Sequence, residues 1–183
     1  MYLKEGYTTN LRGNISILIN GGNIMFFREK IALSTFLDEI QNELKSRHFL
    51  ATLIMSLMVP DVCNGENADG DDYKKWVEKY YRQHSCISED FTADVVYMLR
   101  CSILHSAKTY KNISLRYNSK ADYYLGHLSV IIHDNNTGKE TREIGLNINE
   151  FAEEMIASAR AYMADNGEDP LLFSMIDYDK IQY

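Results

Sequence analysis

The sequence predicts a mainly helical bundle that carries a β-hairpin before its last helix. Apolar residues recur at three- and four-residue spacing through most of the chain, which is typical of amphipathic helices. The exception is a β-branched segment and a more polar one around turn-forming residues, which predict a hairpin at about 124–147. No internal repeat or low-complexity stretch divides the chain. We therefore expect a single helical domain over residues 25–183, preceded by an N-terminal lead at 1–24.

Composition excludes several classes of protein. The 183 residues carry a formal net charge of −7, with 45% hydrophobic and 25% charged residues, as expected for one globular domain. This acidic balance argues against non-specific coating of nucleic acid, although local basic patches remain open. The longest apolar stretch, residues 49–60, is too short to span a bilayer, so no membrane association is expected. Three sparse cysteines favour a reducing compartment, and we expect a cytoplasmic protein.

The first half of the chain predicts three helices. A stripe of apolar residues within 26–45 indicates an amphipathic helix, and residues 49–59 are apolar nearly all round, which indicates a buried helix. Pro60 is expected to help end that helix. Residues 61–72 contain loop-forming residues and acids, and we expect a mobile acidic loop. A helix with an aromatic face follows at 73–81.

The second half predicts two more helices and the hairpin. Ser88 is expected to cap a helix whose apolar stripe runs over residues 91–104. Because an isolated hairpin is marginal, the hairpin must lie on the bundle or pair with residues 15–19. Asn147, with an acid three residues later, resembles a capping box that opens the last helix. The chain then ends in an acidic tail with an apolar cluster at 171–176.

Common catalytic and metal-binding motifs are missing from the sequence. It contains no Gly-rich phosphate loop, no dinucleotide fingerprint and no Gly-x-Ser-x-Gly elbow. His84 and Cys86 lack a second pair of ligands at zinc-finger or zinc-ribbon spacing, and the acidic loop fails the pattern of a calcium site. We therefore expect no metal and no cofactor.

Arg100 and His105, near the end of the fourth predicted helix, have complementary chemistry. A guanidinium is always charged and binds phosphate oxygens through a planar fork, while an imidazole transfers protons near neutral pH. Together they suit metal-free cleavage of RNA, in which a ribose 2′-OH attacks the adjacent phosphorus. The alternative is structural: Arg100 is a solvated or acid-paired helix residue, and His105 interacts with the helix dipole.

The same pair gives the chain a resemblance to the HEPN family of helical-bundle proteins. Arg100 is followed by His105 after four residues at the end of a late helix, and a charged amphipathic helix precedes the apolar helix at 49–59. The resemblance covers roughly residues 26–110. It implies a homodimer in which two Arg–His pairs meet in one composite site. It also implies metal-independent endoribonuclease activity in a toxin–antitoxin or antiviral system, with Arg100 and His105 catalytic.

A basic, tyrosine-bearing segment at 106–122 follows this pair. Its cations can hold phosphates and its tyrosines can stack on a base, while Tyr97 lies one helical turn before Arg100 and would line the same cleft. The alternative is a solvated loop. The expected substrate-binding residues are Tyr97, Lys108, Tyr110, Lys111 and Arg116, with Tyr117 as a second stacking candidate.

Two other functions stay open at this point. The first is a non-catalytic HEPN-like interaction or regulatory protein that binds a protein partner or a small ligand through the acidic loop 61–72 or the apolar cluster 171–176. The second is a nucleotide-binding accessory factor of a mobile element, although no phosphate loop supports it. For the endoribonuclease, the expected partners are a second copy of the chain, RNA, and an antitoxin or regulatory protein.

Overall fold

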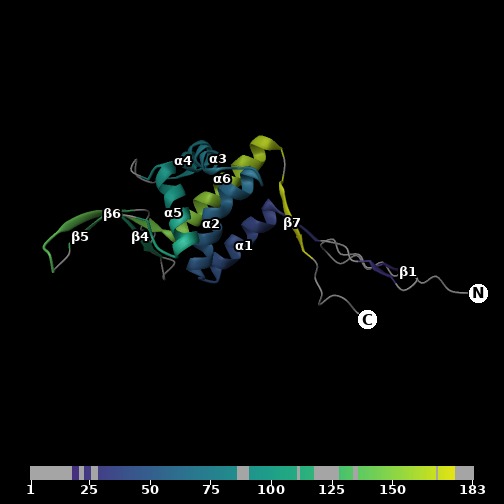
Figure 1. Cartoon of the computed structure of the whole chain (residues 1–183), viewed down its shortest axis with the longest axis horizontal. Coiled ribbons are helices and arrows are strands. Elements are labelled where there is room, and N and C mark those ends of the chain that lie inside the picture. The colour runs from purple at the N-terminus through teal and green to yellow at the C-terminus, as the bar shows by residue number, and fades with distance from the viewer. Residues whose placement is uncertain are drawn as a thin grey trace, which may run out of the picture.

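The protein is mainly helical in its computed structural model, which describes residues 18–20, 23–25, 29–85, 91–110, 112–117, 128–133, 136–167 and 169–175. Helices cluster in the middle of the molecule, and strands lie at two ends of this cluster (Figure 1). The helical elements are α1 (Leu33–Lys45), α2 (Phe49–Asn64), α3 (Gly70–Trp76), the π-helical segment η1 (Val77–Tyr81), α4 (Arg82–His84), α5 (Ala93–Ser106) and α6 (Ile148–Asn166).

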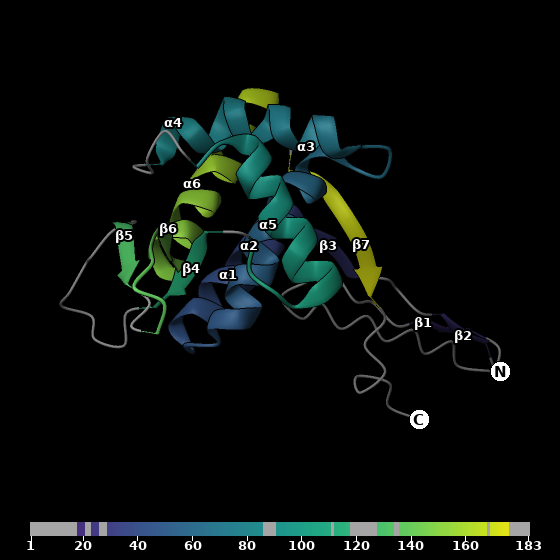
Figure 2. The ribbon, with the colours of Figure 1, turned by 60° about the vertical axis from the view of Figure 1, so that its left-hand side comes forward.

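Among the described residues, the strands form three small sheets. One is the antiparallel pair of β1 and β2, and another is the antiparallel pair of β3 and β7. The third has the order β4-β6-β5, with β4 parallel and β5 antiparallel to β6. Figures 1 and 2 place the third sheet and the β3–β7 pair at opposite ends of the helices. The strands are β1 (Leu18–Asn20), β2 (Asn23–Met25), β3 (Glu29–Ala32), β4 (Ile113–Arg116), β5 (Leu128–His133), β6 (Glu140–Asn147) and β7 (Leu171–Met175).

Helix α2 is the centre of the bundle. It packs against α1, α3, α5 and α6, which explains why its sequence is apolar nearly all round. Leu53, Leu57 and Val59 are completely buried within this packing. The neighbouring helices each contribute one apolar face, as their three- and four-residue spacing predicts. The core therefore surrounds α2, and the other helices present their polar faces outward.

Helix α1 begins later than the apolar stripe within 26–45 predicts. Residues 29–32 form β3, so the helix starts at Leu33. The backbone N–H of Leu33 donates to the carbonyl of Pro170, and Asp169 accepts from both the N–H and the hydroxyl of Ser34. Bonds from the distant end of the domain thus satisfy the start of the helix, which local periodicity cannot reveal.

Helix α2 continues past Pro60, so the prediction that this proline helps end the helix is wrong. A proline inside a helix lacks the N–H that would bond to the preceding turn, and its ring crowds the carbonyl four residues earlier, but packing around the next turn can offset this cost. Pro60 and Cys63 are both buried in the core, so the additional turn buries apolar surface. The helix ends at Gly65, whose positive φ of 82° is easily adopted only by glycine, while its N–H donates to the carbonyl of Asp61.

The predicted acidic loop at 61–72 is mostly helical, which corrects that prediction. Residues 61–64 belong to α2, and α3 begins at Gly70. Asp69 caps α3, because its Oδ1 accepts from the N–H groups of Asp71 at 2.8 Å and Asp72 at 3.0 Å. The aromatic face that the sequence predicts next is confirmed. Its members are all buried: Tyr73, Trp76, Val77, Tyr80 and Tyr81.

Helix α5 begins at Ala93, so Ser88 is not its cap. The cap is Thr92, whose side chain accepts from the N–H of Val95, while Ser88 lies outside the described residues. Ser88 and Thr92 are both residue types that cap helices, so the residue type alone does not decide between them. The helix ends before Ala107, which adopts the left-handed conformation and donates its N–H to the carbonyl of Ile103.

The predicted hairpin is confirmed by the antiparallel pairing of β5 with β6. Its further partner is β4, which pairs parallel with β6 and lies inside the segment first interpreted as a basic loop. Of the two supports that the sequence left open for the hairpin, pairing with residues 15–19 does not occur at Leu18 and Ile19, which pair with β2. Asn147 caps α6 as predicted, with Oδ1 accepting from the N–H of Asn149. The apolar cluster at 171–176 supplies β7.

Candidate functional site

Arg100 lies in the middle of α5 and is held by Asp61 of α2. The Nε and Nη2 atoms of Arg100 each lie 3.0 Å from the same carboxylate oxygen, Oδ2 of Asp61. Both side chains are partly buried, with exposed fractions of 23% for Arg100 and 34% for Asp61. The extension of α2 beyond Pro60 is what brings Asp61 to α5. The guanidinium therefore has a fixed orientation between two helices.

This contact uses only one edge of the guanidinium. An arginine has five N–H donors, and Asp61 accepts from the edge that carries Nε and Nη2. The other edge carries Nη1, which lies 3.9 Å from Sγ of Cys101, a weak acceptor. Three N–H groups therefore remain without a strong acceptor in these contacts. That number is enough for a planar bidentate contact with an oxyanion.

Tyr97 reaches the same place from one helical turn earlier. A hydrogen bond with the Cys101 side chain, and repulsion between the tyrosinate and a thiolate at that position, raise the pKa of Tyr97. The ring packs over Gly70, where an added Cβ would lie 2.6 Å from the tyrosine hydroxyl. It also lies tilted against the ring of Tyr73, with centroids 5.5 Å apart. Tyr97 and Arg100 therefore both approach Cys101.

Burial shapes the electrostatics of this cluster. Desolvation raises the pKa of Asp61, while the charge and hydrogen bonding of Arg100 act in the opposite direction. For Arg100 itself, desolvation opposes the attraction of Asp61, and the net pKa is raised. Tyr73 is fully buried beneath the pair, and its hydroxyl donates to the carbonyl of Leu57 at 2.9 Å. The site thus consists of the Arg100 guanidinium paired with Asp61, next to the buried, neutral ring of Tyr73.

His105 is exposed in the last turn of α5. Five residues on a helix correspond to about 140° of rotation from Arg100, so the two side chains leave the helix in different directions. Cys101, however, precedes His105 by four residues and lies on the same side, one turn away. Nη1 of Arg100 lies beside Cys101, and no described contact joins the guanidinium to His105. In the described part of the chain, the imidazole makes no hydrogen bond or ion pair.

The described residues of the basic segment, 106–110 and 112–117, do not join this cluster. Lys108 is exposed beyond the end of α5, Tyr110 is half-buried against the core, and Lys111 lies outside the described residues. Arg116 ends β4 and is half-buried, with its Nη1 covered and lacking a hydrogen-bond partner among the described residues. No described contact links these residues to Arg100. Of the expected substrate-binding residues, the structure brings only Tyr97 beside Arg100.

Sequence reasoning missed Asp61 and Cys101. Asp61 directly follows Pro60, which signals a helix end, so it was assigned to the acidic loop. One signal in the sequence points to Asp61: it lies four residues after Leu57 and seven after Ile54, so it continues a face of the predicted helix. Cys101 was noticed only as the neighbour of Arg100. Its place between Tyr97 and His105 at four-residue spacing could have identified it as a member of the same helix face.

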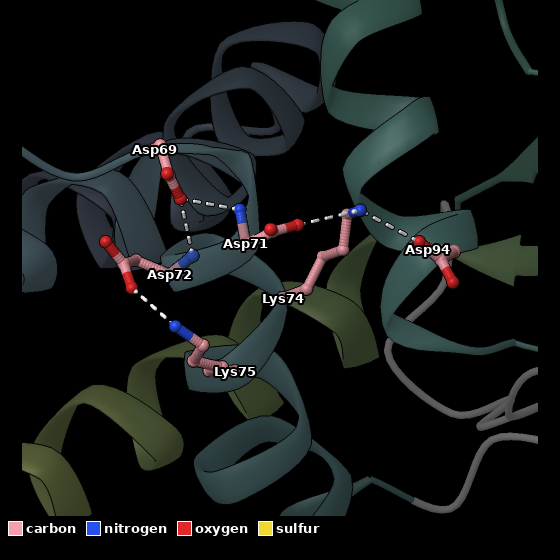
Figure 3. A network of polar contacts seen from close by, with 6 residues as sticks. All are labelled: Asp69, Asp71, Asp72, Lys74, Lys75 and Asp94. Carbon is pink, nitrogen blue, oxygen red and sulfur yellow. Dashed lines mark hydrogen bonds and ion pairs between the residues drawn. The ribbon is translucent and has the colours of Figure 1, made fainter.

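A second polar cluster lies at the outer surface of α3 (Figure 3). Lys74 contacts Asp71 at 3.4 Å and Asp94 of α5 at 3.1 Å, and Lys75 contacts Asp72 at 3.0 Å. Hydrogen bonds to these carboxylates raise the pKa values of both lysines, which stay protonated and are poor bases. An open recess of about 610 Å³ lies here, and its lining is Asp71, Lys74, Lys75, Glu78, Lys79, Ala93 and Asp94. The cluster links α3 to α5 and is not centred on Arg100.

The fold and the cluster around Arg100 define a class: a mainly helical domain in which an arginine on a late helix is held by an acid of another helix. No family model, curated protein or solved structure matches the chain. Among the described residues, no helix is long and apolar enough to cross a membrane. The same residues contain no group of three or more His, Cys, Asp or Glu side chains arranged to hold a metal ion.

Proposed function

We propose that the protein is a metal-independent endoribonuclease of HEPN type that acts as a homodimer. The observation that carries this proposal is the open edge of Arg100. Asp61 holds the edge with Nε and Nη2, and the edge with Nη1 faces Cys101, one turn before the exposed His105. An oriented guanidinium with free donors, near an exposed imidazole, supplies the two functions that cleavage of a phosphodiester requires.

The chemistry follows from these two groups. An imidazole of His105 takes the proton of a ribose 2′-OH, and the oxygen attacks the adjacent phosphorus. The bond from phosphorus to the 5′-oxygen breaks, and that oxygen takes a proton from an acid. Arg100 donates hydrogen bonds to the non-bridging oxygens, where charge grows. The products are a 2′,3′-cyclic phosphate and a 5′-hydroxyl, and DNA is not cleaved because it has no 2′-OH.

A dimer supplies the second proton-transfer group. One imidazole cannot take one proton and donate another on opposite sides of the phosphorus in the same step. In a symmetric pair, His105 of one subunit acts as the base and the partner's His105 acts as the acid. The different directions of Arg100 and His105 within one helix fit this division, because each phosphate can contact Arg100 of one subunit and an imidazole of the other.

The test is cleavage of a mixed RNA pool by purified protein in EDTA. Wild-type protein is expected to give products that end in 2′,3′-cyclic phosphate, and His105→Ala and Arg100→Ala are each expected to lose this activity by 10²-fold or more. Arg160→Ala is the matched control, because Arg160 is exposed on α6, away from α5. Intact RNA with all folded preparations, or equal loss in the control, would contradict the proposal. An antitoxin that co-purifies would be seen as a second band.

A non-catalytic interaction protein is the second candidate, and one observation favours it. The Asp61–Arg100 pair joins α2 to α5, and such a pair stabilises a bundle whether or not it binds phosphate. The segments first expected to dock on a partner are engaged within the chain, however. Asp69, Asp71 and Asp72 cap α3 or pair with lysines, and residues 171–175 pair with β3. An interaction protein would therefore use another surface.

A further inference from the structure

An exposed aromatic pair lies where α2 begins. The rings of Phe49, the first residue of α2, and Tyr117, which follows β4, are stacked with centroids 4.4 Å apart and 24° between their planes. Phe49 is partly buried and packed against the core, whereas Tyr117 is 58% exposed. One face of the tyrosine ring is thus supported by Phe49, and much of the ring remains open to solvent. We call Phe49 and Tyr117 the stacking platform.

The exposure of apolar surface is concentrated at this platform. In the described part of the chain, three large apolar residues are exposed: Leu50, Met98 and Tyr117. Two of them adjoin Phe49, because Leu50 is its neighbour in the chain and Tyr117 covers its ring. Leu50 is 63% exposed at the first turn of a helix that is otherwise central to the core. The exposed surface of the platform itself is that of the Tyr117 ring, and an aromatic ring held in place by a neighbouring ring is suited to a flat ligand.

The turn before the platform carries exposed cations and is held by backbone hydrogen bonds. Lys45 and Arg47 are exposed there, and the nearby acid, Glu43, is already paired with His48 at 2.9 Å. The N–H of Arg47 donates to the carbonyl of Leu44, and the N–H of His48 donates to that of Glu43. Arg47 has φ of 62°, a left-handed conformation that favours glycine. A long cation thus occupies a position where glycine would be more stable.

We propose that the stacking platform and Arg47 bind one unstacked base and the adjoining phosphate of a single-stranded nucleic acid. Every base offers a flat π-face to an aromatic ring, and a nearby guanidinium neutralises the backbone, which is the usual combination in proteins that bind single strands. Lys45 and Arg47 form no ion pair with the described residues, and these exposed cations favour a polyanion over a second copy of this acidic chain. That the strand is RNA rests on the proposed function, but binding at the platform does not require cleavage.

The first experiment measures binding of a fluorescein-labelled oligothymidine by anisotropy in EDTA. Single-stranded DNA is the probe because it lacks the 2′-OH and stays intact during the measurement. Tyr117→Leu is expected to weaken binding about 5- to 150-fold, the effect of losing one stacked base, while Tyr117→Phe, which keeps the ring, binds like wild type. An oligonucleotide with abasic sites has no base to stack, so its affinity for the wild type should be as low as its affinity for Tyr117→Leu.

The second experiment uses a variant that keeps the turn intact. Arg47→Gly suits the left-handed φ and should leave the protein equally or more stable to urea. If Arg47 neutralises one phosphate, the variant should lower the slope of log affinity against log salt by about 0.7. Tyr117→Leu should leave that slope unchanged. The two variants thus separate the contact with the base from the contact with the phosphate.

The outcomes separate this proposal from the proposed function. If RNA is not cleaved but oligothymidine binding depends on Tyr117 and Arg47, the endoribonuclease is rejected and the platform stands. If RNA is cleaved and both variants bind oligothymidine like wild type, the platform is rejected alone. A change in sedimentation coefficient for Tyr117→Leu without loss of affinity would also overturn the platform, because it would identify a contact between copies of the chain.

Discussion

Asp61 and Arg100 meet side-on, with one carboxylate oxygen 3.0 Å from both Nε and Nη2 of the guanidinium. This geometry decides which part of the arginine is available to a ligand. A carboxylate at the opposite edge would have covered Nη1 and left only the edge beside the aliphatic stem. With Asp61 in its observed place, the edge with Nη1 faces Cys101, a weak acceptor, and takes no part in the link between the helices.

Asp61→Asn tests whether this link stabilises the bundle. The amide keeps an acceptor but loses the charge, so we expect the free energy of unfolding to fall by about 1–3 kcal/mol. The loss should lie toward the lower end, because desolvation outweighs the attraction of Arg100 and leaves the pKa of Asp61 raised. Urea unfolding measures it. Asp94→Asn, which breaks an exposed pair with Lys74, is the control and should cost about 0–1 kcal/mol. Equal losses would contradict the expectation.

Gly70→Ala tests the position of Tyr97. The new Cβ would lie 2.6 Å from the tyrosine hydroxyl and 2.7 Å from Cζ, so the ring must leave its place. We expect a loss of about 1–3 kcal/mol in the free energy of unfolding, together with lower RNA cleavage. In a Tyr97→Ala background the same change should be neutral or stabilising, since alanine is the better helix former. Additive effects of the two substitutions would show that they do not interact.

Alkaline pH should destabilise the protein. Burial raises the pKa of the Cys63 thiol from 9.0 to about 12, so the folded state keeps a proton that the unfolded chain releases above pH 9. The stabilisation is therefore complete below pH 9 and declines by about 1.4 kcal/mol per pH unit as the pH rises toward 12. Burial also raises the pKa values of Tyr73 and Tyr81, which steepens the decline above pH 10.

Urea unfolding at several pH values between 8 and 11 measures this decline. Cys63→Ala should be less stable at pH 8, because it leaves a cavity, but its stability should fall less steeply above pH 9. Parallel curves for the variant and the wild type would show that Cys63 does not cause the decline.

Tyr81→Phe tests a buried link between η1 and α6. The hydroxyl of Tyr81 donates to Oε2 of Glu154 at 2.9 Å, and both residues are buried. Removal of the hydroxyl deprives a buried carboxyl group of this donor, so we expect a loss of about 1–3 kcal/mol by thermal or urea unfolding. Tyr162→Phe removes a bond to the carbonyl of Cys63 at a half-buried position and should cost less. The reverse order would contradict this assignment.

Local patterns in the sequence predicted the elements whose signals are local. The aromatic face of residues 73–81, the hairpin and the cap at Asn147 each depend on residues close in the chain, and the structure confirms them. The strands β3 and β7 have no such signal. They pair across most of the domain, and each is too short for its periodicity to be distinguished from the helix or tail beside it. β4 could not be predicted for the same reason, because its four residues are too few to show a periodicity.

The site was predictable only in part. The sequence identified Arg100, Tyr97 and His105, and the structure brings the first two together at Cys101. It did not identify Asp61, because Pro60 indicates a helix end, whereas core packing holds α2 in helical form for one more turn. Nor could it show that Tyr110 is half-buried and that Tyr117 is the tyrosine with an open ring. Exposure depends on what packs around a residue, which periodicity does not record.

The pairing of β3 with β7 sets an order of events during synthesis on the ribosome. β3 and the start of α1 are made early, yet their partners, residues 169–175, are made after every described helix. Until residues 169–175 have left the ribosome, the part of the chain that has emerged exposes an unpaired β3 and a start of α1 that lacks these bonds. During that interval β3 is open to a wrong strand, and chaperones that bind extended segments would find it there.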